Sequence, residues 1–197
     1  EALRQLKIIS YFRLANYMRP MEVDKDAHLF KPDSLFENAV DLYYFDKQLR
    51  VLLFTAVQSV EIALRSNIIH YLSMRYGAFW FMDENLSDNK SLFAENLSHI
   101  NKELKRSRED FISAHFAKYT SPQFPPVWKT LEVVSFGTLS KLLENFNDKH
   151  VKKAIAKDFN LPQHLYLESW VKSIAVLRNC IAHHSRIWNR RFPLKPQ

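Results

Sequence analysis

With 197 residues, of which 47% are apolar, the chain is long enough for one domain or two small ones with a real core. Two glycines are too few for the many tight turns of a β-rich protein, and a single cysteine, Cys180, excludes an intramolecular disulfide and fits a reducing cytoplasm. The formal net charge is +7, and no run of about 18 uninterrupted apolar residues occurs, so we expect an all-α protein without a transmembrane helix or membrane contact.

Residues 1–33 predict a helix and a loop that pack on a helical bundle. Apolar residues at helical spacing fill the first stretch until Pro20 stops the helix, and a loop continues to Pro32. The next stretch, SLFE, is typical of a capping box, with Ser34 as the N-cap and Glu37 at the third helical position. A new helix is therefore expected to begin here.

The pattern that follows stays helical through Tyr76 without a proline or glycine, and Gly77 ends it. This stretch is too long for one ordinary helix, so we expect a break within residues 46–50. Residues 92–119 look helical again, with a strongly charged middle, and the proline-rich stretch TSPQFPP predicts a loop.

Shorter helices are expected after this loop. Pro126 suits the first turn of a helix that runs through Val134 and ends near Gly137. The stretch TLSKLLENF then predicts a short helix. Asp148 is placed to cap the helix that comes next. Because the connections are short and no repeat occurs, residues 1–197 are predicted to form a single helical domain.

The last long helix is predicted to begin at Pro162 and to carry a pair of histidines at its end. Arg178 has the spacing of the border of the buried face, and a partly buried guanidinium requires a partner, either a carboxylate of the protein or a phosphate. The buried stripe of this helix is expected to be Leu167, Trp170, Val171, Ile174, Leu177 and Ile181.

The end of this helix gathers polar groups in the stretch RNCIAHH. Asn179 and His183 are four residues apart and share one helix face, whereas His183 lies about 140° around the helix from Arg178 at about 100° per residue. One straight helix cannot aim both groups at one point. Either the helix distorts at its end, or a two-fold dimer brings two such clusters together around one ligand.

The charge of the C-terminal stretch points to a partner. From Arg178 to Gln197 the chain has five basic residues and no acidic one. This concentration suits a polyanion, RNA or DNA, although a solvated tail would have the same composition. Histidine acts as base or acid near neutral pH and arginine holds phosphate oxygens, so the cluster has the chemistry for RNA cleavage without a metal.

Other interpretations of the cluster stay open. A histidine at a helix end is most often a solvated surface residue. Cys180 lies four residues before His184 and permits a cysteine–histidine nucleophile, although a structural cysteine is commoner. Adjacent histidines point in different directions and have no further ligand at i+4 spacing, so we expect no metal and no cofactor.

Three stretches, YFRLANYMRP, VEIALRSNIIHYL and LRNCIAHHSRIWNRRF, resemble in this order the Abi-like proteins of the AbiD/AbiF type, which act in bacterial abortive infection. The last stretch also fits the R-x4-6-H pattern of HEPN domains, with Arg178 and His183 at its ends and Asn179 in its polar slot. The resemblance covers most of the chain. It implies a HEPN-like helical bundle with additional helices.

The resemblance also implies a function. HEPN nucleases are metal-independent endoribonucleases, and they dimerise so that two R-x4-6-H motifs form one site. Carried over by position, Arg178 would bind phosphate, His183 would transfer protons and Asn179 would orient either group, with His184 as an auxiliary. The expected RNA contacts, chosen by charge, are Arg186, Arg190 and Arg191.

Two further residues have alternative interpretations. Glu61 and Arg65 are four residues apart on one helix, which favours an exposed salt bridge. Alternatively, Glu61 reaches Arg178 or His183 and sets the pKa of the histidine as an auxiliary group. Trp188 has the chemistry to stack on a base, but packing against the last helix is favoured.

The sequence thus predicts a homodimeric, metal-independent endoribonuclease of a phage-defence or toxin system, which cuts RNA through attack of the 2′-OH. One alternative is a non-catalytic RNA-binding module, in which the same cations hold RNA. In either case an inhibitory small RNA or antitoxin is a further expected partner, and a cytoplasmic location is expected. The remaining alternative is a structural dimer whose polar helix end pairs with acidic residues of its mate.

Overall fold

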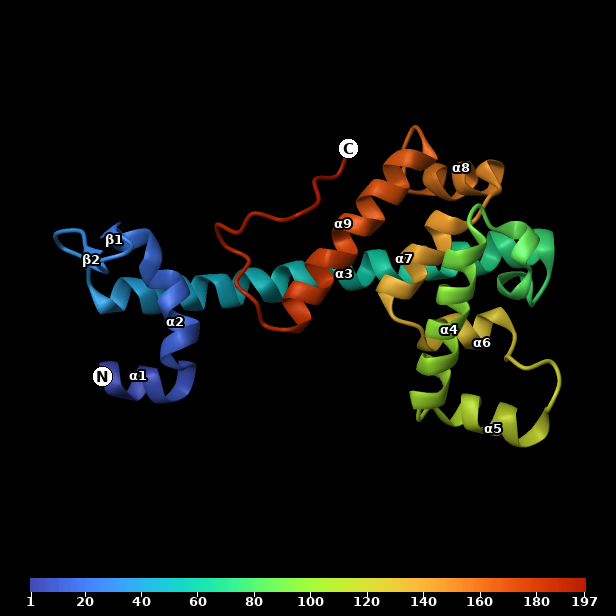
Figure 1. Ribbon diagram of the computed structural model, residues 1–197, viewed down its shortest axis with the longest axis horizontal. Helices are drawn as coiled ribbons and strands as arrows, with labels where there is room; N and C mark the ends of the chain where they lie inside the picture. The colour runs from blue at the N-terminus through green and yellow to red at the C-terminus, as the bar shows by residue number, and fades with distance from the viewer. The chain divides into compact units, whose positions relative to one another are not determined.

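The computed structural model describes residues 1–197, and helices make up most of it, which confirms the all-α prediction (Figure 1). The helices are α1 (Ala2–Ile9), α2 (Tyr11–Met18), α3 (Phe36–Tyr76), α4 (Lys90–Arg106), α5 (Asp110–Lys118), α6 (Val127–Val133), α7 (Phe136–Asn145), α8 (Lys149–Asp158) and α9 (His164–Ala182). Short 3-10 turns occur at Arg19–Met21, Trp80–Met82 and Glu84–Leu86.

The chain divides into two compact units. Unit 1 comprises residues 1–56 and 179–191, and unit 2 comprises residues 57–178 and 192–197. Both α3 and α9 therefore contribute residues to each unit. The single domain expected over residues 1–197 stays a prediction.

In unit 1 the core is built by the first three helices. Leu14 and Tyr17 of α2 are three residues apart and fully buried, and they pack with Ile9 of α1 and with Ala39 and Val40 of α3. These apolar residues share one cluster, so the N-terminal helices are held by burial of apolar surface against α3.

The N-terminal helix predicted as one element is in fact two. Ser10 has a backbone φ of 68°, which no right-handed helix accommodates, so α1 ends before it and α2 begins after it. The loop predicted after Pro20 contains a small antiparallel hairpin of β1 (Glu22–Asp24) and β2 (Leu29–Phe30). Its turn is held by the carboxylate of Asp24, which accepts two backbone N–H groups.

The helix α3 runs without interruption for 41 residues, so the break predicted within residues 46–50 is wrong. The stretch has neither glycine nor proline, and Asp46 and Arg50, four residues apart, form an ion pair along the helix instead of interrupting it. The helix begins at Phe36, one residue later than a Ser34 N-cap requires. Its end at Gly77, with a φ of 82°, is as predicted.

One window of 18 residues in α3 has a mean hydropathy of 1.2, and 22% of that window is buried. By length and composition alone this helix is therefore apolar enough to cross a membrane, as core helices of soluble proteins also are. The expectation of no membrane contact stays a prediction.

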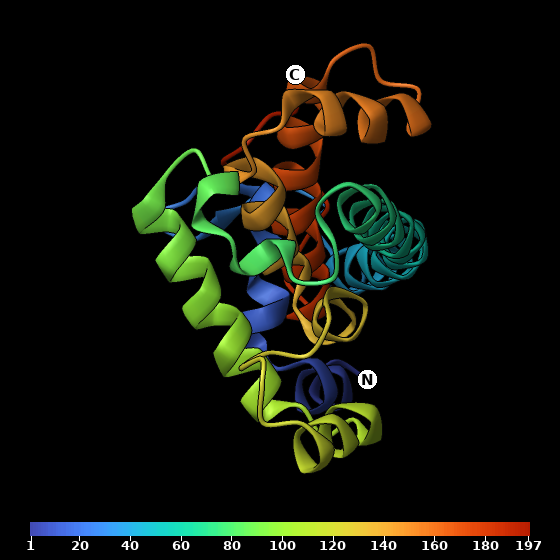
Figure 2. The same ribbon diagram turned by 90° about the vertical axis from the view of Figure 1, so that its right-hand side faces the viewer.

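In unit 2, α4 packs against α6 and α7 (Figure 1 and Figure 2). The part of α3 that belongs to this unit contributes Leu64, Ile68 and Leu72, which follow one another at i, i+4 spacing on one buried face. Their cluster includes Ile100 and Leu104 of α4, Leu131 of α6, Leu139 of α7, Ile155 of α8 and Val171 of α9.

The predicted helix over residues 92–119 is divided into α4 and α5, because residues 107–109 leave the helical conformation after Arg106. The caps are closer to prediction. Pro126 is the N-cap of α6, and Asp148 caps α8 by accepting the N–H groups of His150 and Val151.

Two predictions need correction elsewhere in this unit. Gly137 does not weaken a helix end but lies inside α7, whose N-cap Ser135 precedes it. Trp170 is not part of the buried stripe of α9. Its side chain is 45% exposed, and its indole N–H donates to the carbonyl of Gln197 at 2.8 Å, which satisfies the one polar atom of the ring.

Candidate functional site

The last turn of α9 ends in a hydrogen-bonded cap in unit 1. The N–H of His184 donates to the carbonyl of Ile181 at 2.9 Å, and the N–H of Ser185 donates to the carbonyl of Cys180 at 2.9 Å. This pair of bonds is the Schellman motif, in which the residue after the helix takes a left-handed conformation. That residue is His184, with a φ of 54°, where glycine is usual.

The helix therefore ends at Ala182, and His183 and His184 both follow it. Both histidines are exposed, and the N–H of His183 still donates to the carbonyl of Asn179 at 3.0 Å. The sequence placed both residues on the helix. The left-handed turn at His184 redirects the chain only after the helix has ended, and the meeting of Arg178 and His183 at one point stays a prediction.

A buried carboxylate holds the chain that follows the histidines. Asp46 of α3 is fully buried, and its Oδ1 accepts the N–H of Ile187 at 3.0 Å and that of Trp188 at 2.6 Å. Arg50 donates to the same carboxylate, which keeps its charge paired in the interior. The carboxylate of α3 thus fixes where the segment after α9 lies within unit 1.

Tyr17 completes this buried network. Its hydroxyl donates to Oδ2 of Asp46 at 2.5 Å and receives a bond from Arg50 at 3.4 Å. Burial, and then the hydrogen bond to Asp46, raise the pKa of Tyr17 to about 12. Tyr17 therefore stays a neutral donor across the ordinary pH range.

A cavity of about 540 Å³ opens beside the histidines in unit 1. Its charged lining consists of three arginines together with the two histidines, and no carboxylate lines it. A site with cations and imidazoles but no anions suits an anionic ligand. We call it the histidine pocket, and its residues are Ser10, Phe12, Arg13, Asn16, Tyr17, His183, His184, Ser185, Arg186 and Arg190.

Backbone carbonyls hold two of these arginines in place. Arg13 donates to the carbonyl of His184 at 2.8 Å, and Arg186 donates to the carbonyl of Asn16 at 3.2 Å. These bonds join α2 to the segment after α9 within unit 1. Because a carbonyl accepts a hydrogen bond without cancelling the charge, both guanidinium groups keep a full positive charge in the pocket.

Of the residues predicted from the sequence, four line the histidine pocket: His183, His184, Arg186 and Arg190. Asn179 is exposed on the last turn of α9 and Arg191 is exposed beyond the pocket, so neither is among its lining residues. Trp188 has the packing role that was favoured, but it packs against the core cluster of α1, α2 and α3 in unit 1 and not against the last helix.

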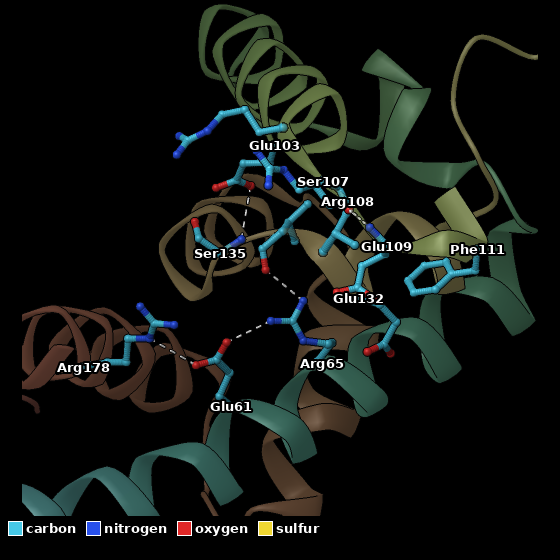
Figure 3. A pocket seen from close by; sticks show the side chains of 13 residues that line it. Glu61, Arg65, Glu103, Ser107, Arg108, Glu109, Phe111, Glu132, Ser135 and Arg178 are labelled. Carbon is cyan, nitrogen blue, oxygen red and sulfur yellow. Dashed lines mark hydrogen bonds and ion pairs between the residues drawn. The ribbon is translucent and has the colours of Figure 1, made fainter. Parts of the chain in front are cut away.

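Arg178 belongs to unit 2, where the predicted need for a partner is met by Glu61. The Nε atom of Arg178 lies 3.5 Å from Oε2 of Glu61, while Oε1 of Glu61 accepts a hydrogen bond from Arg65 at 2.9 Å (Figure 3). Arg65 also donates to the carbonyl of Val134 at 3.0 Å. One carboxylate is thus shared by two guanidinium groups, and both interpretations of Glu61 hold in part.

The expected exposure of the Glu61–Arg65 pair is wrong, because their side chains are only 16% and 10% exposed. These residues and Arg178 line a second cavity, of about 760 Å³, which we call the arginine pocket (Figure 3). Its remaining residues are Glu103, Arg106, Ser107, Arg108, Glu109, Phe111, Glu132, Val133, Val134 and Ser135.

Sequence reasoning missed the group that organises unit 1. Asp46 stands in an apolar stretch four residues before Arg50, and this spacing was a usable signal for an ion pair on a helix. Arg13 was also not predicted to meet the histidine segment. Its partner, the carbonyl of His184, lies 171 residues away in the chain, and no local pattern predicts that contact.

Metal-ligating groups do not gather in this chain: nowhere do three or more His, Cys, Asp or Glu side chains lie together as they would around an ion. Cys180 is a free, partly buried thiol on the last turn of α9. Its carbonyl serves the cap of that helix by accepting the N–H of Ser185.

The fold and the pocket define an all-α protein with a basic cavity built around two histidines. Comparison with protein families gives a match over residues 4–189 to the model described as Abi-like protein. The chain therefore belongs to the Abi-like family of abortive infection proteins. Neither the curated proteins nor the solved structures that were searched gave a match.

Proposed function

We propose that this Abi-like protein is a metal-independent HEPN endoribonuclease of a phage-defence system, with the histidine pocket as part of its RNA site. The observation that carries the proposal is the lining of that pocket, where His183 and His184 stand among three arginines with no carboxylate. RNA is the polyanion that this charge suits, and an imidazole is the group that suits proton transfer near neutral pH.

The reaction follows from the groups available. A base takes the proton of the 2′-OH, and the oxygen then attacks the adjacent phosphorus. The bond to the 5′-oxygen breaks, and an acid protonates that oxygen, which leaves a cyclic phosphate on one fragment and a 5′-hydroxyl on the other. His183 fills these proton-transfer roles, and Arg178, the other end of the R-x4-6-H pattern, stabilises the charge on the phosphate.

Asn179 and His184 have supporting roles in this proposal. The side chain of Asn179 orients the catalytic imidazole or the phosphate, and His184 supplies a second imidazole on the wall of the pocket. Glu61 is an auxiliary group that pairs with Arg178 and holds its side chain in place. Arg186, Arg190 and Arg191 contact the RNA backbone by charge, so their effect on affinity depends on salt.

A homodimer supplies the second histidine, because one proton must be taken and another given in the same reaction. Unit 1 offers a surface for a second copy. Phe45 and Leu52 of α3 are 52% and 71% exposed, and because they are seven residues apart they lie on one face of the helix. An exposed apolar patch of this kind marks an interaction surface.

The dimer is tested by light scattering on the purified protein. We expect the wild type to be a dimer and the Leu52→Glu variant to be a monomer that is folded but inactive, because a charge in the centre of an apolar contact prevents association. Met74→Glu, which changes another exposed apolar residue on α3 in unit 2, is the matched control and should stay dimeric. If the monomeric variant still cuts RNA, the active site is not shared between two copies of the chain.

The cleavage itself is tested with purified protein and labelled RNA in the presence of EDTA. We expect the wild type to cut RNA and His183→Ala to lose about 10²–10⁴-fold in rate, which is the usual contribution of general acid–base catalysis. His150→Ala, an exposed histidine of α8, is the control for a general loss of imidazole and should leave the rate unchanged. Cleavage that EDTA abolishes would overturn the metal-free mechanism.

A second candidate function is a non-catalytic RNA-binding module, regulated by a small RNA or antitoxin. The same observation supports it, since three arginines in one pocket bind RNA with or without cleavage. If His183→Ala keeps the RNA affinity but loses cleavage, the binding-only function is excluded. If the wild type binds RNA with a steep salt dependence and cuts none, the binding function replaces the nuclease.

A further inference from the structure

Phe12 is an apolar residue in an unusual place. Its side chain is 84% exposed, which is the largest exposure of any large apolar residue in the chain. The core side of α2 is formed by Leu14 and Tyr17, so Phe12 points away from the core of unit 1. Exposing an aromatic ring forgoes the free energy of its burial, and the ring is left free to contact a ligand.

The ring belongs to the wall of the histidine pocket. Phe12 lines this cavity together with Arg13, His183 and His184. The ring of Tyr11 packs edge to face with that of Phe12, with 5.7 Å between the ring centroids, and the side chain of Asn16 donates to the backbone carbonyl of Phe12 at 3.1 Å. The bond from Arg13 to the carbonyl of His184 fixes this turn of α2 beside the histidines.

The pocket thus combines a free aromatic face with cations and no carboxylate. Proteins that bind single strands of nucleic acid use this combination, in which cations follow the phosphates and an aromatic ring stacks on a base. A base inside a double helix is stacked on its neighbours and has no free face for Phe12, whereas an unpaired base has one. The ring therefore selects for unpaired nucleotides.

We infer that Phe12 forms a stacking subsite for one unpaired base, so that the substrate class is single-stranded RNA. This inference rests on the proposed function, because it takes RNA as the ligand of the histidine pocket. In the bound state the base lies on the ring of Phe12, and the phosphate next to it lies among Arg13, Arg186 and the histidines. The subsite sets which nucleotides reach the imidazoles, but it takes no part in proton transfer.

The test is a binding measurement that does not depend on cleavage. Fluorescence anisotropy of a short labelled single strand, and of the same strand in a duplex, is followed in protein that carries His183→Ala so that the RNA stays intact. We expect Phe12→Leu to weaken binding of the single strand about 5- to 100-fold, as one stacked base does, and to leave the duplex unchanged. Phe12→Trp keeps the affinity because it keeps the stacking face.

Two controls separate stacking from a general loss of structure. Phe116→Leu changes another exposed phenylalanine, on α5 in unit 2, and should bind both RNAs like its parent. The second control is a series of single strands in which each position in turn carries an abasic nucleotide. For one strand of the series, Phe12→Leu and its parent should bind equally well, because the base that stacks on Phe12 is already absent.

The outcomes distinguish this inference from the proposed function. If Phe12→Leu binds the single strand as tightly as its parent, the stacking subsite is overturned even if the protein cuts RNA. The subsite is also overturned if the only effect of Phe12→Leu is the loss of the dimer. RNA that binds with the expected Phe12 dependence but is never cut supports the subsite and overturns the nuclease. A protein that binds no RNA of either form overturns both.

Discussion

Two cavities of this protein are both lined by arginine side chains, but the charges around these arginines differ. In the histidine pocket of unit 1, arginines and histidines line the wall without a carboxylate. In the arginine pocket of unit 2, charges of the two signs balance: arginines 65, 106, 108 and 178 face glutamates 61, 103, 109 and 132. A count of arginines does not distinguish the two cavities, whereas the partners of the arginines do.

The difference lies in what accepts their hydrogen bonds. Arg13 and Arg186 in unit 1 donate to backbone carbonyls, which satisfy the N–H groups and leave the charge in place. Arg65 and Arg178 in unit 2 share the carboxylate of Glu61, which cancels part of their charge. Arginines held by carbonyls therefore mark a surface that is prepared for an anion, whereas arginines that share a carboxylate keep only part of their charge for a ligand.

The carboxylates of the two units differ in the same way, and substituting them gives the largest expected change in stability. Asp46→Asn leaves the buried Arg50 without its anion and weakens the acceptor of two backbone N–H groups, so we expect a loss of about 3–5 kcal/mol. Glu61→Gln, whose parent side chain is partly exposed, should lose about 1–3 kcal/mol.

Urea denaturation of both variants measures these losses. Equal losses would contradict the view that the Asp46 network is the better buried of the two. The same experiment has a functional readout. RNA cleavage by Asp46→Asn should fall even where the variant is fully folded, because the segment that follows His184 loses its attachment to α3.

A smaller effect is expected at high pH. Burial and the bond to Asp46 raise the pKa of Tyr17 from 10.0 to about 12, so the folded state keeps a proton that the unfolded chain releases earlier. The contribution of Tyr17 to the free energy of unfolding is complete below pH 10. It is lost as the pH rises from 10 to 12, with a slope of about 1.4 kcal/mol per pH unit.

The difference in unfolding free energy between wild type and Tyr17→Phe, measured against pH, isolates this slope. The matched variant in unit 2 is Tyr71→Phe, which removes a bond of 2.9 Å to Asp158 near the surface and should show a shallower dependence. If the difference in unfolding free energy between wild type and Tyr17→Phe does not change above pH 10, the folded state does not raise the pKa of Tyr17.

The contrast between the pockets also predicts two salt dependences. Arg186→Ala removes a cation of the histidine pocket, so the slope of log affinity for RNA against log salt should fall by about 1. Arg106→Ala removes a cation that faces glutamates, and the slope should stay as in the wild type. If Arg106→Ala lowers the slope and Arg186→Ala does not, RNA binds the arginine pocket instead.

Most of the fold was predictable because its signals are local. The scarcity of glycine indicated helices, Asp148 and Gly77 marked helix ends, and the helical spacing identified Leu167, Val171 and Ile181 as buried residues of α9. The errors occur where a local signal was read alone. Asp46 and Arg50 look like a polar interruption in the sequence, but they form an ion pair along the helix and bind a distant segment.

The site was predictable only in its chemistry. The sequence named His183, His184, Arg186 and Arg190, all of which line one pocket. It did not supply the wall opposite them, because Phe12 and Arg13 come from the N-terminal helices and meet the histidines through the hydrogen bond at the His184 carbonyl. A contact between positions this far apart leaves no periodicity for a pattern to detect.

The smallest predicted effect concerns the ends of two helices. In unit 2 the residue after α3 is Gly77, with a φ of 82°, whereas in unit 1 the left-handed residue after α9 is His184, with a φ of 54°. Glycine takes this conformation without strain and a histidine does not, so His184→Gly should stabilise the protein by roughly 0.5–1 kcal/mol after the added freedom of the unfolded chain is counted.

The neighbouring substitution tests the sign of that effect. His183→Gly changes a residue whose φ is not positive, so the same substitution should destabilise by roughly 0.5–1 kcal/mol, and thermal unfolding compares the two. If His184→Gly is more stable yet cuts RNA more slowly, the imidazole is kept at a strained position for its chemistry. If His184→Gly is less stable than wild type, the left-handed turn carries no strain and gives no evidence of function.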